Sequence, residues 1–255
     1  MHQVARCAVI PDIHENIAWA ARVLAAEKMA GADLIVFLGD YFDTTMKHHE
    51  RVGKRPTCEW LLKVREEWRG KCVFLLGNHD LHYLEARPDC LGHHQPRRRQ
   101  YYRCSGFTAG GAHNVAKGLP VEFWDEARLF VCVNGYLLSH AGVARRFWRE
   151  AATVAESLDA LQRNCDEAIQ TIRHLPHRLL TCGAARGGDA PVGGITWLDW
   201  DKEFTDDLPL GQIVGHTGSD AGARQKGRSW CIDGHQTCHG LLTPSGFQIV
   251  YPKKQ

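Results

Sequence analysis

Long hydrophobic runs and a dominant charge are both missing from this sequence. No stretch of about 18 apolar residues occurs, so no transmembrane helix is predicted. The first apolar stretch meets Pro11 and Asp12 too soon for a signal peptide. Lys and Arg (31) nearly balance Asp and Glu (29), a net charge of +2 that does not favour coating a nucleic acid or a membrane. We expect a cytoplasmic protein with no obligatory nucleic-acid partner and no membrane partner.

CxxC pairs, internal repeats and low-complexity tracts are also absent. The 10 cysteines therefore indicate neither a zinc ribbon nor a thioredoxin-type site, and in a reducing compartment most would be free thiols. With 44% apolar and 24% charged residues, the chain is not disordered, collagenous or a coiled coil. Its 255 residues can bury a substantial core, and nothing marks a boundary. We predict a single domain over residues 1–255.

Short apolar runs and helix-like stretches alternate in the first third of the chain. The predicted strands are 5–10, 34–38, 72–76, 129–133, 136–139, 212–214, 230–232 and 247–250. The predicted helices are 15–30, 57–69 and 150–174. Strand–helix alternation over residues 5–76 predicts a parallel α/β beginning. The closer spacing of the later strands indicates hairpins and a mixed sheet.

Two stretches read as loops or insertions. Residues 87–103 are basic and contain three consecutive arginines, Arg97–Arg99. We predict a basic insertion here, which would either cover a functional site or bind an anionic substrate, although a charge run is more often a solvated surface. Residues 181–194 are rich in glycine and contain Arg186.

Histidine, the commonest metal ligand, is abundant at 15 residues, and several histidines stand where a predicted strand ends. Five strand ends carry polar residues of metal-ligand type: Asp12-Ile13-His14, Gly39-Asp40 with Asp43, Gly77-Asn78-His79-Asp80, His140-Ala141-Gly142 and Gly215-His216-Thr217. The carboxyl ends of strands in open α/β sheets converge on the binding crevice, so these segments are expected to meet. Each motif alone is common turn chemistry; the five in order are the signal.

The types of these residues indicate a metal site without thiolates. Asp, His and Asn favour ions such as Mn, Fe, Zn or Ni over a cysteine-bound zinc. Six ligands are too many for one catalytic zinc, which has three protein ligands and a water. They suit two ions about 3.5–4 Å apart.

With these motifs the sequence resembles the calcineurin-like metallophosphoesterases. Within that superfamily it is most similar to the phosphoprotein phosphatase branch, which includes bacterial protein phosphatases and diadenosine tetraphosphatase-like enzymes. The matching motifs span residues 12 to 216. The resemblance implies an α/β fold of the four-layer α+β type. Mixed β-sheets would form a sandwich flanked by helices, with a dinuclear metal site at the strand carboxyl ends.

The resemblance also implies a role for each residue. Asp12, His14 and Asp40 would bind the first ion, and Asp40 would bridge to a second ion bound by Asn78, His140 and His216. His79 would donate a proton to the leaving oxygen while Asp43 orients it. Asn78 would also contact the substrate. Two divalent ions are expected, with Mn preferred and Fe, Zn, Ni and Co as alternatives.

The sequence departs from the family pattern at two positions. Gly218 stands where many phosphodiesterases of the superfamily have a second histidine, which favours the phosphatase branch. Thr44 follows Asp43 where that branch usually has a phosphate-binding arginine. Another cation must then hold the phosphate. Arg186 is the preferred candidate for this substrate-binding role, ahead of Arg145 and Arg146.

The predicted function is a dinuclear metal-dependent phosphohydrolase that cleaves phosphomonoesters by in-line attack of a metal-bridging hydroxide. Its partner would be a phosphorylated small molecule or a phosphoprotein, as for a serine/threonine protein phosphatase. The alternatives are a dinucleoside polyphosphate hydrolase of diadenosine tetraphosphatase type, a phosphodiesterase using the same site, and a non-catalytic scaffold. A Cys/His cluster at 90–104 matches no standard zinc spacing, and a solvated loop is favoured there. A second cluster, at 231–239, resembles a metal site, but the resemblance implies a strand end at 232–234, so a structural role is favoured.

Overall fold

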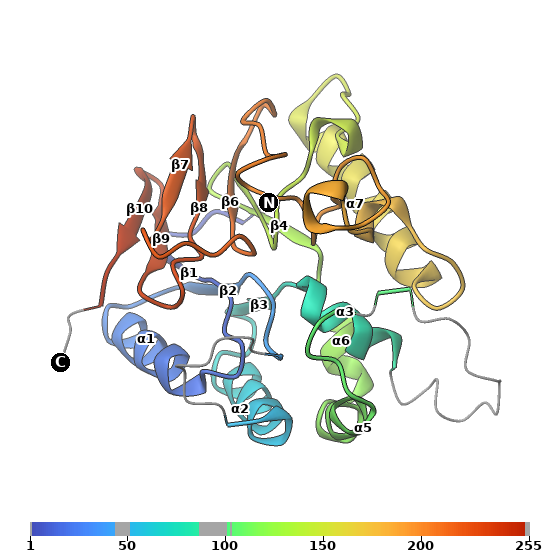
Figure 1. Ribbon diagram of the computed structural model, residues 1–255. Coiled ribbons are helices and arrows are strands. Elements are labelled where there is room, and N and C mark those ends of the chain that lie inside the picture. Colours follow the sequence, from blue (N-terminus) through green and yellow to red (C-terminus); the bar gives the residue numbers. More distant parts are fainter. Residues whose placement is uncertain (1, 44–51, 87–100, 103, 253–255) are drawn as a thin grey trace.

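Two five-stranded mixed sheets pack face to face in this protein, and helices cover their outer faces (Figure 1). The structure is a computed structural model and describes residues 2–43, 52–86, 101–102 and 104–252. The first sheet has the order β10-β9-β1-β2-β3 and the second β4-β5-β6-β8-β7. The expected α/β sandwich with flanking helices is confirmed.

The first sheet begins with three parallel strands, as the alternation of strands and helices predicts. Its strands are β1 (Cys7–Ile10), β2 (Leu34–Phe37), β3 (Cys72–Phe74), β9 (His239–Thr243) and β10 (Gly246–Val250). The last two run as an antiparallel hairpin that joins the sheet beside β1. The polar residues that follow β1, β2 and β3 therefore leave the sheet at the same edge.

The second sheet is assembled from hairpins around a parallel centre. Its strands are β4 (Phe130–Val133), β5 (Tyr136–Ser139), β6 (Gly211–Val214), β7 (Arg224–Lys226) and β8 (Ser229–Cys231). β5, β6 and β8 are parallel to one another, whereas β4 and β7 are antiparallel edge strands. The ends of β5 and β6 deliver His140 and His216.

Successive side chains of a strand point to opposite faces of its sheet, so each strand contributes to two layers of the core. Val9 and Val36 face Leu138 and Ile213 in the core between the sheets. The intervening residues Ala8, Ile10, Ile35 and Phe37 face the helices instead. The helices are α1 (Ile17–Met29), α2 (Lys54–Glu67), α3 (Asn78–Glu85), α5 (Ala109–Gly118), α6 (Val121–Glu126) and α7 (Val154–Thr171).

Several helix predictions need correction. The first helix begins at Ile17 and not at residue 15, because Glu15 has a left-handed φ of 66° and Asn16 caps the helix by accepting the Trp19 N–H. The helix predicted over 57–69 is α2, which begins earlier, at Lys54. The helix predicted over 150–174 is α7, which covers only Val154–Thr171.

Among the described residues, three α-helices (α3, α5 and α6) and two strands (β7 and β9) have no counterpart among the predictions. α3 is buried on nearly all sides and so has no amphipathic stripe, and α5 contains glycines, which are poor helix formers. β7 is a polar edge strand, and β9 starts with His239-Gly240. None of the described helices is both long and apolar enough to span a bilayer.

Candidate metal centre

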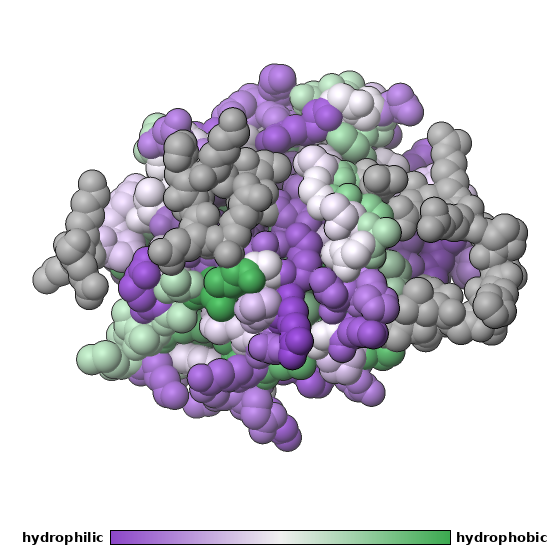
Figure 2. Space-filling view, turned by 60° about the horizontal axis from the view of Figure 1, so that its bottom comes forward, coloured by the Kyte–Doolittle hydropathy of each residue, from purple (hydrophilic) through white to green (hydrophobic). Residues whose placement is uncertain are grey.

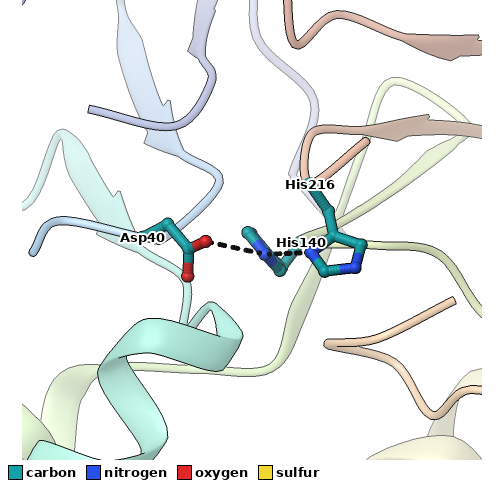
Figure 3. Close-up of side chains that lie close together, drawn as sticks. All are labelled: Asp40, His140 and His216. Carbon is teal, nitrogen blue, oxygen red and sulfur yellow. Dashed lines mark hydrogen bonds and ion pairs between the residues drawn. The ribbon is translucent and has the colours of Figure 1, made fainter. Parts of the chain in front are cut away.

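Five separated segments converge at the carboxyl ends of the strands. Asp12 follows β1, Asp40 follows β2 and Asn78 begins α3 after β3, all from the first sheet. His140 and His216 follow β5 and β6 of the second sheet. Figure 3 shows Asp40 facing His140, with His216 on the far side of the His140 ring. The structure thus brings together the residues that the sequence places at its strand ends.

Two groups of ligand-type side chains share one carboxylate. Asp12, His14 and Asp40 form the first triad, and Asp40, His140 and His216 form the second. Within each triad the candidate ligand atoms lie within 4.8 Å of one another. Asp40 belongs to both triads, so its carboxylate is the group that the two candidate ion sites have in common.

In the first triad, His14 is held with one ring nitrogen turned toward the carboxylates. Its Nδ1 lies 3.0 Å from the Phe42 carbonyl oxygen, which can only accept, so Nδ1 carries the proton. Nε2 then presents its lone pair 3.9 Å from Asp12 and 3.7 Å from Asp40. Burial and the nearby His79 lower the pKa of His14 to about 4, so the ring is neutral at pH 7. A neutral imidazole fixed by a carbonyl is typical of a metal ligand.

The second triad shows the same arrangement at His140. Its Nδ1 faces the Leu38 carbonyl oxygen at 2.9 Å, which leaves Nε2 unprotonated. Around that Nε2 lie Asn78 Oδ1 at 3.0 Å, His216 Nδ1 at 3.1 Å and Asp40 Oδ2 at 3.4 Å. Burial lowers the pKa of His140 to about 3, and it lowers the pKa of His216 as well.

The contact of His140 Nε2 with Asn78 Oδ1 is the observation that tests for a cation, because both atoms are acceptors. Lone pairs that face each other at about 3 Å repel unless a positive charge lies among them. The same separation is expected between neighbouring ligands of an octahedral ion whose bonds are about 2.1 Å long. The residues present therefore fit a divalent ion.

The carboxyl groups of the first triad are also unfavourable without a cation. Burial, followed by the neighbouring Asp233 carboxylate, raises the pKa of Asp12. Burial and the neighbouring Asp12 likewise raise the pKa of Asp40. Two adjacent buried carboxylates cost free energy that bound cations would offset.

Asp80 fixes the backbone that carries Asp40. Its carboxylate accepts the backbone N–H groups of Asp40 at 2.7 Å, Tyr41 at 3.0 Å and Gly77 at 2.8 Å. Asp40 has a left-handed φ of 52°, a conformation that such bonds must maintain. Glycine is required at 77, because a Cβ there would lie 2.1 Å from Asp40 Oδ1.

His79 and Asp43 lie beside the triads as a pair. Nδ1 of His79 is 3.6 Å from Asp43 Oδ2, which is longer than a hydrogen bond. That Nδ1 is buried and has no hydrogen-bond partner. The His79 ring also packs edge-on against His14, with centroids 5.3 Å apart. The pair is adjacent to the first triad because the His79 ring contacts His14, while Nδ1 of His79 faces Asp43.

Arg186 reaches the same region from the glycine-rich loop. Its Nε contacts Asp199 Oδ2 at 2.7 Å, and its Nη2 donates to Thr217 Oγ1 at 2.8 Å. Thr217 directly follows His216, and the positive charge of Arg186 contributes to the lowered pKa of both His140 and His216. The side chain is 30% exposed. Arg145, a weaker candidate, pairs instead with Glu150 at 2.6 Å.

Sequence reasoning missed several residues that shape the site. Asp80 ends the Gly77-Asn78-His79-Asp80 motif, and the motif alone predicts no role for it. Asp43 is surrounded by four further side chains, those of Lys54, His82, Tyr83 and Glu15. His82 and Tyr83 directly follow the Gly-Asn-His-Asp motif within the same helix, and that position was the available signal.

The structure describes the Cys/His cluster at 231–239, but only part of the basic stretch and of the cluster at 90–104. The basic stretch 87–103 lies almost entirely outside the described residues, as do Cys90, His93 and His94. Cys231 and Cys238 are buried, and each lies near backbone carbonyl oxygens. Among the described residues, the potential metal-binding groups are the two triads alone. Trp197 stacks edge-on against His216, at 5.7 Å between centroids, and Trp200 is buried.

The outer surface gives no competing apolar site on the face in Figure 2. Hydrophilic residues run through the middle of that face, and strongly hydrophobic residues form only small areas. The described residues have few exposed large hydrophobic side chains: Met29, Tyr101, Leu175 and Tyr251. A small number of exposed apolar residues is normal for a folded protein.

Comparison with solved structures supports this fold. A cold-active protein-tyrosine phosphatase of a psychrophilic Shewanella species aligns with a TM-score of 0.61 and 13% identity, covering 97% of this chain and 81% of the other. A structure described as a putative diadenosine tetraphosphatase aligns with a TM-score of 0.51 and 13% identity, covering 100% and 98%. At this identity the likeness shows the shared fold.

No curated protein matches the chain. A family model does: the model described as calcineurin-like phosphoesterase matches residues 5–220, a stretch that contains both triads, His79 and Asp43. Members of this family are hydrolases that typically bind divalent metals, and the triads offer the ligands. The chain belongs to the calcineurin-like phosphoesterase family.

Proposed function

We propose that the protein is a dinuclear metal-dependent phosphohydrolase that cleaves phosphomonoesters. The observation that carries the proposal is the pair of triads that share Asp40. Asp12, His14 and Asp40 would hold one ion, and Asp40, Asn78, His140 and His216 the other. Manganese is the expected metal, because mixed carboxylate, amide and imidazole ligands suit it. When bound, two such ions polarise phosphoryl oxygens and lower the pKa of a bound water.

The protein's own side chains would supply the remaining chemistry. His79 would donate the proton on its Nε2 to the leaving oxygen, since its Nδ1 faces Asp43. Asp43 would hold the ring in this orientation. The Asn78 amide and Arg186 would bind the phosphate; Arg186 reaches the Thr217 hydroxyl next to His216 and remains partly exposed. Asp199 would keep the guanidinium in place.

The first experiment measures activity and metal content together. Purified protein with Mn²⁺ should hydrolyse p-nitrophenyl phosphate, bind two ions per chain and lose activity in EDTA. A folded protein that is inactive with Mn, Co, Ni and Zn would overturn the proposal. Parallel assays with a phosphoserine peptide and diadenosine tetraphosphate would rank the substrate classes.

A second experiment tests the acid. With phenyl phosphate, whose leaving group needs a proton, we expect His79→Ala to lower kcat about 10²- to 10⁴-fold, the usual contribution of general acid catalysis, while metal content stays at two ions. His113→Ala, on the exposed face of α5, is the matched control and should leave kcat unchanged. Loss of metal from the His79 variant would show that this histidine is a ligand and not the acid.

A further inference from the structure

The Asp43 carboxylate is surrounded by donors that the proposed chemistry does not yet use. Oδ1 accepts the Tyr83 hydroxyl at 2.7 Å and lies 2.5 Å from Lys54 Nζ. Oδ2 lies 2.7 Å from His82 Nε2. The carboxylate is 0% exposed, and an unpaired charge there would be costly. Burial acts to raise the pKa of Asp43, but the donors on it outweigh burial and hold that pKa well below its usual range.

Two histidines of one helix approach the same carboxylate oxygen. His79 and His82 are three residues apart on α3 and so share a face. His82 Nδ1 lies 3.5 Å from Cys104 Sγ, whose S–H can donate to it. We therefore assign the His82 proton to Nε2, from which it is donated to Asp43. His82 acts as a fixed donor, and Oδ2 keeps a lone pair for His79 Nδ1.

Lys54 binds this carboxylate to a second one. Its Nζ lies 2.5 Å from Asp43 Oδ1 and 2.5 Å from Glu15 Oε1. Glu15 Oε1 in turn accepts the Asp43 backbone N–H at 3.1 Å. Lys54 is therefore the ammonium that separates two buried carboxylates, and it is only 16% exposed itself. Without it, like charges would face each other in the core.

Close packing leaves Asp43 little freedom to move. The backbone at Gly106 approaches so closely that a Cβ there would lie 2.6 Å from Asp43 Cβ and 3.0 Å from its Cγ. Among the contacts with described residues, Lys54 and Tyr83 occupy one oxygen and His82 the other, which leaves Oδ2 a second lone pair on the side of His79.

We propose that Lys54 is a positioning residue for the leaving-group acid. Together with Tyr83 and His82, it holds the Asp43 carboxylate so that a single lone pair is presented to His79 Nδ1. The inference rests on the proposed role of His79 as the proton donor. It adds the residues that fix the orientation of the acid, and each of them acts through its contact with Asp43.

The test uses two substrates that differ in their need for an acid. Phenyl phosphate has a poor leaving group that requires protonation, whereas 2,4-dinitrophenyl phosphate has a good one that does not. In Mn²⁺-loaded full-length protein, Lys54→Met should lower kcat for phenyl phosphate about 10-fold or more, a part of the general-acid contribution. The kcat for the dinitrophenyl ester should change less than about 3-fold, and KM and metal content should not change.

Controls separate positioning from folding. Lys63→Met removes a 72% exposed lysine of the same helix and should change neither rate. Lys54→Arg should restore part of the phenyl phosphate rate by returning a cation. Tyr83→Phe removes only one donor to Asp43 Oδ1 and should show a smaller loss of the same selective kind. If Lys54→Met does not fold, Tyr83→Phe provides the test of the positioning role.

The outcomes distinguish this inference from the proposed function. If His79→Ala is selective for phenyl phosphate but Lys54→Met and Tyr83→Phe lower both rates equally or neither, the positioning role is wrong. If His79→Ala itself shows no selectivity, the acid assignment in the proposed function fails first. Selective losses in all three variants support both.

Discussion

The two sheets contribute unequally to the two triads. Asp12, His14 and Asp40 all belong to segments that follow β1 and β2 of the first sheet. The second triad combines Asp40 from the first sheet with His140 and His216 from the second. The first site therefore depends on neighbouring loops of one sheet, whereas the second also depends on how the sheets pack against each other.

The chemistry of the two sides differs as well. The first sheet brings carboxylates whose pKa burial raises, and the second brings imidazoles whose pKa burial lowers. Opposite shifts have one cause, because burial disfavours the charged form of both groups. Neutral imidazoles can bind a cation at pH 7, while the ionised carboxylates need one.

Asp40→Asn should have the largest effect, because it removes the group shared by both triads. We expect activity to fall at least about 10³-fold and both ions to be lost. The Asn Oδ1 can still accept the His79 N–H, which Asp40 Oδ1 accepts at 2.8 Å, so the fold should survive. Retention of two ions and of normal kcat would show that the triads do not share a bridging ligand.

The Asp40→Asn variant also tests how the buried Asp40 carboxylate affects thermal stability. A raised pKa in the folded protein means that the Asp40 contribution to stability is lost as pH rises through that pKa. Without metal at pH 8, Asp40→Asn should therefore have a Tm equal to or above that of the wild type. With Mn²⁺ the order should reverse, because ion binding stabilises only the wild type. Thermal unfolding in EDTA and in Mn²⁺ measures this crossover.

Asp12→Asn and His216→Ala should separate the two sites. Each removes a ligand from one triad only, so each should lower metal content from two ions toward one per chain. Removing one partner of a metal site typically weakens it by an order of magnitude or more, about 10- to 100-fold even for supporting groups. Metal analysis together with spectroscopy of the Co²⁺ form would show different remaining sites, and identical spectra would contradict the assignment.

Arg186→Met should have a smaller effect, confined to substrate binding. Loss of a charge-assisted contact of about 1.5–3 kcal/mol predicts a KM increase of roughly 10- to 100-fold with less change in kcat. Arg145→Met, which removes the pairing partner of Glu150, serves as the matched control. An unchanged KM for Arg186→Met would place the phosphate-binding group elsewhere.

Leu138→Ala should have the smallest effect on activity and tests sheet packing directly. Leu138 is buried between the sheets, and its neighbour Leu137 is equally buried on the opposite face of β5. Both alanine variants should lose about 2–5 kcal/mol of unfolding free energy. Only Leu138→Ala should weaken the second ion more than the first, as measured by metal titration. Equal affinities in the two variants would mean that sheet packing does not control the second site.

Much of this architecture could be predicted from local patterns. The eight predicted strands all exist, since short apolar runs bounded by polar residues are a strong signal. α3 and α5 escaped prediction because one is buried on nearly all sides and the other contains several glycines. The residues around Asp43 escaped it for a different reason, because Lys54 begins α2 and Glu15 follows β1, and both meet Asp43 only in the folded protein.

The sequence by itself determined the chemical composition of the centre. Its strands end in Asp12, Asp40, Asn78, His140 and His216, and the carboxyl ends of strands are where such residues meet. Only the tertiary structure decided which ring nitrogen of His14 and His140 is free, because the Phe42 and Leu38 carbonyl oxygens that hold the other nitrogen are contributed by another strand end. The local sequence sets the residue types and the order of the strands. The tautomers of the histidines, the direction of the donors on Asp43 and the sharing of Asp40 by two triads depend on contacts that exist only in the folded protein.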